Sequence, residues 1–196
     1  MSRHPRSDQT GLTLIELMVV VALIAIVIGL VAPSFKRMIE SQRVQSINSQ
    51  LVTDLQLARS EAVSRGAPVR ITFGSDSSKT CYTLYTYNLS STNLKCNCLL
   101  DVPCAAGVGL MEIHTTRVDV AGGVSVVPNG GPNEFAFDAV AGAVFFLPAD
   151  RGTPAPAPYP IKTSIDVSRS MVTTVGLTGR PTVCAPTGSK MQVPAC

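Results

Sequence analysis

The sequence predicts an α+β fold, in which a long N-terminal α-helix packs on an antiparallel β-sheet globular domain. Three observations lead to this prediction. Residues 12–32 are almost entirely apolar, residues 44–62 carry apolar side chains at helical spacing, and the residues from 68 onward alternate with a period of two. With 196 residues, the chain is long enough for one ordinary domain and an appendage.

The apolar segment has the length of a membrane span. The stretch from Leu12 to Ala32 would measure about 31 Å as a helix, close to the thickness of the hydrocarbon core. It also carries a carboxylate, Glu16, which is costly in lipid and normally marks function. A secretory signal peptide is one alternative, but its cleavage site would fall directly before Pro33, where a peptidase works poorly. A plain membrane anchor accounts for the length of the segment but not for Glu16.

A chain cut between Gly11 and Leu12 would account for both features. The new amino terminus would be a cation, and Glu16 would lie four residues further along, on the same helical face. In a bundle of such helices, Glu16 of one chain could meet the amino group of a neighbour, which would drive docking and fix the axial register. Pro33 removes the N–H group that would bond the carbonyl of Gly29, so a helix kink is predicted there.

The helix is predicted to continue beyond this kink as an amphipathic stalk over residues 34–65. Glu61 and Arg65 form a favourable i,i+4 pair, and Gly66 and Pro68 end the helix. Apolar residues recur at spacings of three and four and form one stripe, which consists of Val44, Ile47, Leu51, Leu55, Ala58 and Ala62.

Short β-rich runs separated by turn signals follow, and they predict antiparallel sheets packed on the stripe. The runs are VRITF, CYTLYTY, MEIHTTRV, VSVV, EFAF, AVFFL, IKTSIDV and MVTTVGL. Residues 148–160 hold five prolines and are predicted to form an extended surface loop. Residues 66–196 are therefore assigned to the globular domain.

Six cysteines lie in this domain, and their even number predicts disulfide bonds in an oxidising compartment. They are Cys81, Cys96, Cys98, Cys104, Cys184 and Cys196. A metal site on the C-x-C-x₅-C run is the alternative, but zinc sites usually show two separated ligand pairs. We expect Cys184 to pair with Cys196, Cys81 with Cys96 or Cys98, and Cys104 with the remaining one.

The sequence lacks the motifs of common enzyme classes. It has no G-x-S-x-G, P-loop, dinucleotide-binding or HExxH pattern, and its two histidines, His4 and His114, lie far apart. The net charge of +3 does not by itself require a polyanionic partner. We therefore predict that the protein is not an enzyme and needs neither a cofactor nor a metal ion.

Two stretches resemble a known family. GLTLIELMVVVALIAI, residues 11–26, resembles the leader-peptidase motif of type IV pilins and type II secretion pseudopilins, although Leu12 stands where the family usually has Phe. DLQLARSEAVSRGAPVRITF, residues 54–73, resembles the GspH/FimT branch of that family. The resemblance implies that residues 1–11 are a prepilin leader, cut after Gly11, and that the new N-terminal residue, Leu12, is methylated.

The resemblance also implies a function. Residues 12–33 would form a transmembrane and filament-core helix, with the globular domain in the periplasm. The protein would be a non-catalytic minor pilin or pseudopilin of the inner membrane. It would then be incorporated in a type IV pilus, in assembly priming or at the tip, or in a type II secretion pseudopilus. Its partners would be prepilin peptidase, other minor and major pilins or pseudopilins, and inner-membrane lipid.

A DNA-binding minor pilin that acts in natural transformation is the alternative function. Some FimT-like proteins bind DNA through a C-terminal G-R-x-R motif, and this chain has Gly179-Arg180-Pro181-Thr182, with the second arginine replaced. Arg180 is therefore the candidate DNA contact. One arginine neutralises about one phosphate, so Arg169 and Lys190 would have to lie close to it. The simpler interpretation is that Gly179 and Arg180 form a turn between strands.

Overall fold

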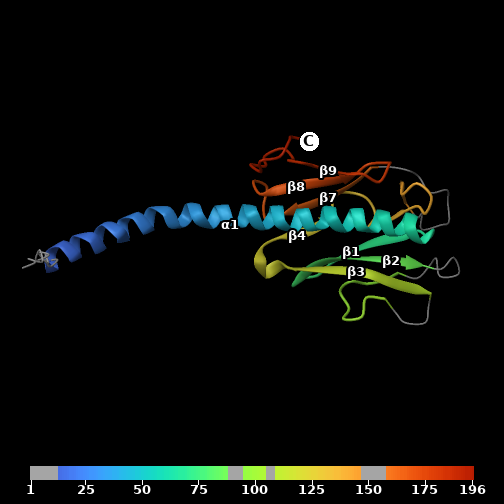
Figure 1. Ribbon diagram of the computed structural model, residues 1–196, viewed down its shortest axis with the longest axis horizontal. Coiled ribbons are helices and arrows are strands. Elements are labelled where there is room, and N and C mark those ends of the chain that lie inside the picture. Colours follow the sequence, from blue (N-terminus) through green and yellow to red (C-terminus); the bar gives the residue numbers. More distant parts are fainter. Residues whose placement is uncertain (1–12, 88–94, 105–108, 147–157) are drawn as a thin grey trace, which may run out of the picture. The chain divides into compact units, whose positions relative to one another are not determined.

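The computed structural model describes residues 13–87, 95–104, 109–146 and 158–196 (Figure 1). The chain divides into two compact units, Met1–Ile39 and Glu40–Cys196. One helix, α1 (Leu14–Arg65), contributes residues to both of them.

In the first unit, the stretch of α1 from Leu14 to Ile28 has apolar side chains on every side, and Glu16 is its one charged residue. Every side chain from Leu14 to Ile28 is exposed in the single chain, although nearly all of them are large and aliphatic. Among the residues that the structure describes, no helix is both long enough and apolar enough to cross a membrane. The membrane span over residues 12–33 stays a prediction.

The second unit contains two antiparallel sheets. The first has the strand order β3-β2-β1-β5-β6, and the second has the order β4-β7-β8-β9. The strands of the first sheet are β1 (Val69–Ser75), β2 (Lys79–Tyr87), β3 (Leu110–Asp119), β5 (Glu134–Phe137) and β6 (Val144–Phe145). Those of the second are β4 (Ser125–Pro128), β7 (Tyr159–Ser164), β8 (Ser170–Val175) and β9 (Pro181–Cys184). A short 3₁₀ turn, η2 (Val120–Gly122), follows β3.

The part of α1 between residues 40 and 65 lies along the two sheets, with β7, β8 and β9 to one side and β1, β2 and β3 to the other (Figure 1). The predicted stripe faces inward, and all of its members are buried except Ile47, which is half-buried. Phe135 and Tyr159 join the two sheets in the core, with ring centroids 4.4 Å apart. Burial of these large apolar surfaces is what stabilises the packing of the helix on the sheets.

The observed elements match the sequence prediction closely. All eight β-rich runs contain a strand, and α1 ends at Arg65, directly before Gly66, which has a φ of 60°. Two details were wrong. The runs did not include β9 (Pro181–Cys184), and the predicted loop over residues 148–160 ends earlier, because Tyr159 and Pro160 already belong to β7. Most of that loop, residues 147–157, lies outside the described residues.

Candidate functional site

The first turn of α1 is capped by its own sequence. The backbone N–H of Glu16 donates to the Thr13 hydroxyl at 3.3 Å, and the N–H of Leu17 donates to the Thr13 carbonyl at 3.2 Å. Thr13 is thus the N-cap, and Glu16 occupies the third helical position, as in a capping box. A carboxylate here also interacts favourably with the helix dipole. The predicted processing residues, Gly11 and Leu12, lie outside the described residues.

The structure has one unbroken helix at the place where the kink is predicted. Residues 14–65, Gly29 and Pro33 among them, are assigned to the single helix α1. A Cβ atom placed on Gly29 would meet no other atom within 4 Å, so packing does not require glycine there. The kink at Gly29 and Pro33 stays a prediction.

The six cysteines form three disulfide bonds. Cys184 pairs with Cys196, as the sequence favoured, and the open choice resolves to Cys81 with Cys98 and Cys96 with Cys104. The bond between Cys81 and Cys98 holds the segment 95–104 against the outer face of the first sheet, since Cys81 lies on β2, and the bond between Cys96 and Cys104 closes a loop within that segment.

Arg117 on β3 reinforces this attachment. Its guanidinium group donates hydrogen bonds to three backbone carbonyls, those of Cys98 at 3.0 Å, Leu100 at 2.6 Å and Asp101 at 3.4 Å. The side chains of Leu100, Asp101 and Val102 are exposed, and we call these three residues the disulfide tip. Its backbone is fixed while its side chains face the solvent.

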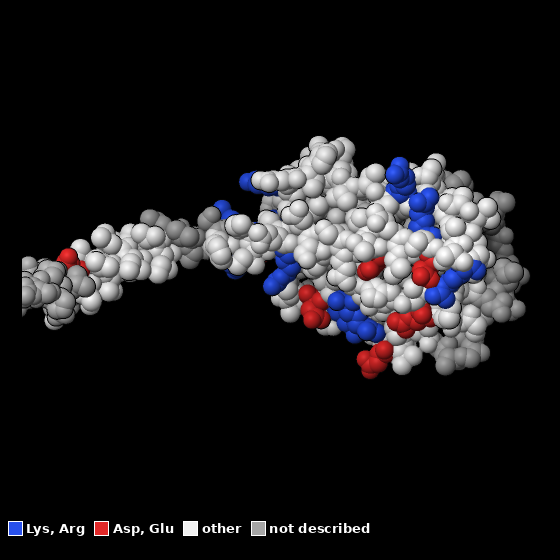
Figure 2. All heavy atoms as spheres, viewed as in Figure 1, with Lys and Arg blue, Asp and Glu red and all other residues white. Residues whose placement is uncertain are grey.

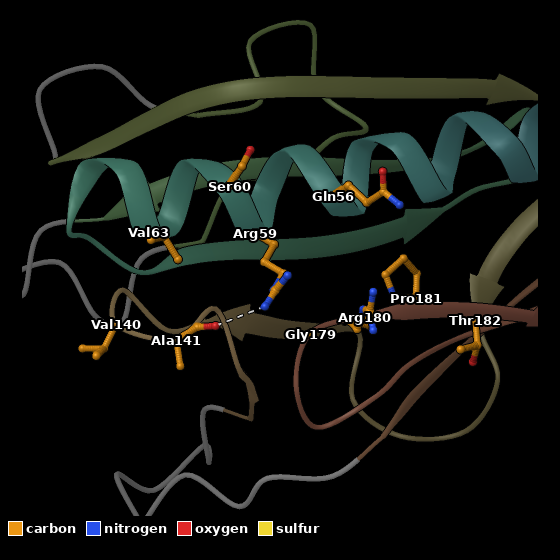
Figure 3. A pocket seen from close by; sticks show the side chains of 10 residues that line it. All are labelled: Gln56, Arg59, Ser60, Val63, Val140, Ala141, Gly179, Arg180, Pro181 and Thr182. Carbon is orange, nitrogen blue, oxygen red and sulfur yellow. Dashed lines mark hydrogen bonds between the residues drawn. The ribbon is translucent and has the colours of Figure 1, made fainter.

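An open pocket of about 740 Å³ lies where α1 meets two turns, one before β6 and one before β9 (Figure 3). We call it the Arg180 pocket. It is lined by Gln56, Arg59, Ser60, Val63, Val140, Ala141, Gly179, Arg180, Pro181 and Thr182. The candidate residue Arg180 is therefore on the surface, in the turn between β8 and β9, as the simpler interpretation expected.

Arg59 ties α1 to the turn before β6. Its side chain points from α1 toward Ala141 (Figure 3), and it donates to the carbonyl oxygens of Gly142 at 3.3 Å and Ala141 at 3.4 Å. Gly179, which has a φ of 76°, packs against the same place, because a Cβ atom there would lie 1.9 Å from the Gly142 oxygen. The backbone N–H of Val144 also donates to the carbonyl of Leu177 at 3.1 Å, which joins β6, at the edge of the first sheet, to the turn between β8 and β9 in the second.

Asp138 organises the other wall of the Arg180 pocket. Its carboxylate accepts hydrogen bonds from the backbone N–H groups of Val140 at 2.7 Å, Ala141 at 2.8 Å and Ala143 at 2.6 Å. Burial alone would raise the pKa of Asp138, but these N–H donors outweigh it and lower the pKa below its usual value. Hydrogen bonds to the carboxylate of Asp138 therefore hold the turn that contains Val140.

Arg169 and Lys190 are the residues that would have to assist Arg180 in DNA binding, and both make other contacts. Arg169 forms ion pairs with Glu40 and with Asp166, so its charge is compensated. Lys190 is exposed, and its backbone N–H bonds Ser168. On the face shown in Figure 2, basic and acidic residues are interspersed over the globular unit, without an extended basic patch.

A buried polar network joins α1 to the first sheet, and the sequence did not reveal it. Asp54 accepts hydrogen bonds from the hydroxyl groups of Tyr82 at 2.6 Å and Thr116 at 3.0 Å, and His114 lies 3.7 Å away. Burial raises the pKa of Tyr82, and the bond to Asp54 raises it further. Asn48, also on α1, accepts from the Thr173 hydroxyl at 2.8 Å in the second sheet.

The described residues offer little for catalysis or metal binding. No group of three or more His, Cys, Asp or Glu side chains in this part of the chain is placed to hold a metal ion. Each cysteine is in a disulfide bond, and His114 belongs to the network around Asp54.

The chain is similar to two solved structures, both of the type IV minor pilin FimU of Pseudomonas aeruginosa. Each is 17% identical to this chain. One match covers 72% of this chain and 88% of the other, with a TM-score of 0.49, and the second covers 71% and 90%, with a TM-score of 0.47. None of the curated proteins matches the chain.

Two family models match the sequence. The prokaryotic N-terminal methylation motif matches residues 6–32, which contain the apolar segment and Glu16. The model of the type II transport protein GspH matches residues 48–179, about two thirds of the chain, from the stalk helix to the turn before β9. The chain therefore belongs to the GspH family and is a minor pilin or pseudopilin of the kind that its sequence motifs resemble.

Proposed function

We propose that this protein is a non-catalytic filament subunit. It resides in the inner membrane before assembly and is then incorporated in a type IV pilus or a type II secretion pseudopilus. In this proposal, prepilin peptidase removes residues 1–11, Leu12 becomes the methylated N-terminus, and the globular unit lies in the periplasm. The observation that carries it is the first turn of α1. Thr13 caps a helix that is apolar all round, and the one carboxylate of that apolar stretch, Glu16, sits in its first turn.

The apolar part of α1 supports the proposal because its side chains are not buried within their own unit. A helix that is hydrophobic on every side is normally buried in a protein core or in lipid. The side chains of residues 14–28 are exposed in the single chain. Lipid before assembly, and the helices of other subunits after it, would cover them.

Glu16 would fix the axial position of each apolar helix relative to the helices of neighbouring subunits. An ionised carboxylate within an apolar environment is costly unless it is paired. After cleavage at Gly11, the amino group of Leu12 on a neighbouring chain is a suitable cation. Pairing of the two groups would favour assembly over the free subunit and set the axial offset between neighbours.

The processing step can be tested on the protein extracted from membranes. Mass spectrometry of the intact chain should show a start at Leu12 and a methylated N-terminus. Replacement of Gly11 by a bulky residue should leave the leader attached. A wild-type chain that begins at Met1, or at Pro33, would contradict the proposal.

The role of Glu16 needs a test that separates pairing from helix capping. Glu16→Ala should still insert in the membrane, but it should fail to enter filaments or to co-purify with partner subunits. Thr13→Val removes the cap and keeps the charge, so it should assemble nearly normally. Glu61→Ala, which removes an exposed ion pair elsewhere on α1, serves as a further control. Normal assembly of Glu16→Ala would refute the pairing argument.

The machine that the subunit serves can be assigned by deletion. Loss of the gene should impair either twitching motility or secretion of exoproteins, and complementation should depend on Glu16. An effect on transformation alone, with motility and secretion intact, would favour the second candidate function.

That second candidate is DNA binding in natural transformation, and one observation favours it. Arg180 is exposed at the rim of a pocket, and no ion pair of Arg180 occurs among the described residues. Because Arg169 is already paired with two carboxylates, we expect only weak duplex binding that disappears between low and physiological salt. Arg180→Ala should remove most of it. A dissociation constant near micromolar at about 0.15 M salt would replace our first proposal with this one.

A further inference from the structure

We propose that one turn of α1, residues 35–39, binds the headgroups of anionic phospholipids at the periplasmic surface of the inner membrane. We call it the interfacial turn, and it consists of Phe35, Lys36, Arg37, Met38 and Ile39. The inference rests on the proposed function as a membrane-resident subunit, and it adds the class of lipid and the side chains that contact it. All five residues belong to the first unit of the chain, as does the apolar stretch of α1.

The interfacial turn is amphipathic, unlike the stretch of α1 before it. Phe35, Met38 and Ile39 are spaced three and four residues apart, so they share one face of the helix. Their exposed fractions in the single chain are 59%, 57% and 46%. Lys36 and Arg37 occupy the other side of the same turn, and both are exposed. A basic side opposite an apolar side is typical of helical segments that lie at the surface of a membrane.

The interfacial turn also lies at the right distance from the first turn of α1. The helix rises about 30 Å between Glu16 and Lys36, which is the thickness of the hydrocarbon core. No charged residue occurs between these two positions. With the globular unit in the periplasm, the first turn of α1 lies near the cytoplasmic surface, and the interfacial turn lies among the headgroups of the periplasmic leaflet.

The charge of the interfacial turn selects the kind of lipid. Neither Lys36 nor Arg37 has an ion-pair partner among the described residues, and the nearest acidic residue in the sequence beyond them, Glu40, pairs with Arg169. Two uncompensated cations at a membrane surface attract lipid phosphate groups, and a guanidinium group can bind two phosphate oxygens at once. A zwitterionic headgroup carries a cation of its own, so a headgroup with a net negative charge is preferred.

The two ends of the apolar stretch would then be stabilised by different partners. Glu16 is paired only when a neighbouring subunit supplies its amino group, whereas Lys36 and Arg37 are paired with lipid before assembly. Entry into a filament replaces lipid by protein around the interfacial turn. The headgroup contact would therefore favour the membrane-resident subunit until the pairing of Glu16 compensates for its loss.

Lipid binding can be measured by native mass spectrometry of the full, processed chain released from detergent micelles. Phosphatidylglycerol and phosphatidylcholine with the same acyl chains are the probes. Wild type should bind phosphatidylglycerol at least about tenfold more tightly, since each of the two cations near an anionic headgroup contributes about fivefold. Equal affinities for the two lipids would overturn the inference.

A competition experiment shows whether the interfacial turn takes a lipid or a free anion. Excess inorganic phosphate should not displace phosphatidylglycerol, because Phe35, Met38 and Ile39 contact the acyl region, which phosphate lacks. Displacement of the lipid by inorganic phosphate would overturn the inference, since it would show a site for free anions and not for a membrane surface.

Charge variants show which residues select the lipid. The chain with both Lys36→Gln and Arg37→Gln should bind the two lipids about equally, whereas the chain with Lys36→Arg and Arg37→Lys keeps both charges and should keep the preference. The matched control carries Arg180→Gln and Lys190→Gln, which remove two exposed cations from the globular unit, and it should behave like wild type. An equal loss of preference in this control would overturn the inference, because the net charge of the chain would then select the lipid.

The same variants separate this inference from the proposed function. N-terminal processing, membrane insertion and incorporation in filaments are measured beside lipid binding. A wild-type chain that is processed and incorporated, but does not prefer phosphatidylglycerol, would overturn the lipid contact and leave the filament function intact. A wild-type chain that is neither processed nor found in the membrane fraction would overturn both.

Discussion

Gly179 approaches Gly142 so closely that a Cβ atom at position 179 would lie 1.9 Å from the Gly142 carbonyl oxygen. Gly179 also has a φ of 76°, a conformation that other residues adopt at a cost. The Gly-Arg pair of the C-terminal turn therefore has a structural reason apart from any ligand. The glycine permits the contact between two turns, and Arg180 follows it at the rim of the pocket.

The first prediction concerns this contact. Gly179→Ala should destabilise the protein by at least about 2 kcal/mol more than Gly130→Ala, because overpacking of backbone against backbone adds to the cost of a positive φ. Gly130 is the matched control, since it has a φ of 85° and no atom within 4 Å of its Cβ position. Urea unfolding of both variants in detergent measures the difference. Equal losses of free energy would show that the contact at Gly142 is not tight.

Periodicity predicted most of the fold from the sequence. The stripe from Val44 to Ala62 has helical spacing and is buried, and the eight β-rich runs each contain a strand. Periodicity alone did not mark β9, because the strand is short and its first residue, Pro181, cannot donate a backbone hydrogen bond. The end of the proline-rich loop was misplaced for a related reason. Pro160 looks like a loop residue but pairs with Thr174 across β7 and β8.

The candidate site was less predictable, because its residues come together only in the folded chain. Arg59 lies in the stretch 54–73 that resembles the GspH/FimT branch, but its contact with Gly142 spans 83 positions of the sequence. Asp54 lies off the apolar stripe, so nothing in the sequence marked it as buried. A signal was available for Thr13 and Glu16, since a threonine followed three residues later by a glutamate before an apolar run indicates a capping box.

The second prediction concerns the bond between Tyr82 and Asp54. Tyr82→Phe should lower the free energy of unfolding by roughly 1.5–3 kcal/mol, the usual range for a hydrogen bond to a charged group. The bond at 2.6 Å is buried, and its loss leaves the carboxylate with Thr116 as its remaining close donor. Tyr87→Phe is the control and should change the stability little, because the ring that contacts Arg70 is retained. Unfolding midpoints of the two variants decide the matter. Equal effects would mean that the bond from Tyr82 to Asp54 contributes no more to stability than the hydroxyl group of Tyr87 does.

The third prediction concerns the C-terminal disulfide. Replacement of both Cys184 and Cys196 by serine should cost about 3 kcal/mol, because the bond closes a short loop and restricts the unfolded chain. The cost would be lower if the backbone bonds of Ala185 to Pro194 and to Cys196 hold the tail in place by themselves. Thiol labelling of the unfolded, unreduced wild type should find no free thiol. Six reactive thiols in that experiment would contradict the pairing.

The fourth prediction is a pH dependence that originates at Asp138. Its pKa in the folded protein is lowered from its ordinary value of 3.8, since the N–H groups of Val140, Ala141 and Ala143 favour the charged form and outweigh the effect of burial. A depressed pKa stabilises the fold at pH values above the unfolded pKa, and this contribution is lost as the pH falls through the folded pKa. Wild type should therefore lose protection of these three amide groups only as the pH falls below 3.8 and through the folded pKa, after correction for the intrinsic exchange rate.

Asp138→Asn provides the comparison that isolates this carboxylate. The amide can still accept bonds through its single oxygen, but it no longer offers an acceptor to the N–H of Ala143, which bonds the second carboxylate oxygen at 2.6 Å. The variant should be less stable than wild type at neutral pH, and the difference should shrink as the pH falls below 3.8. Asp76→Asn is the matched control, because Asp76 also has a lowered pKa, caused by Ser78 and Lys79, but lies in the β1–β2 turn away from the pocket. Amide exchange at Val140 that changes with pH in Asp138→Asn as it does in wild type would show that another group controls the turn. If exchange becomes independent of pH only in Asp138→Asn, then the wall of the Arg180 pocket depends on a single ionised side chain.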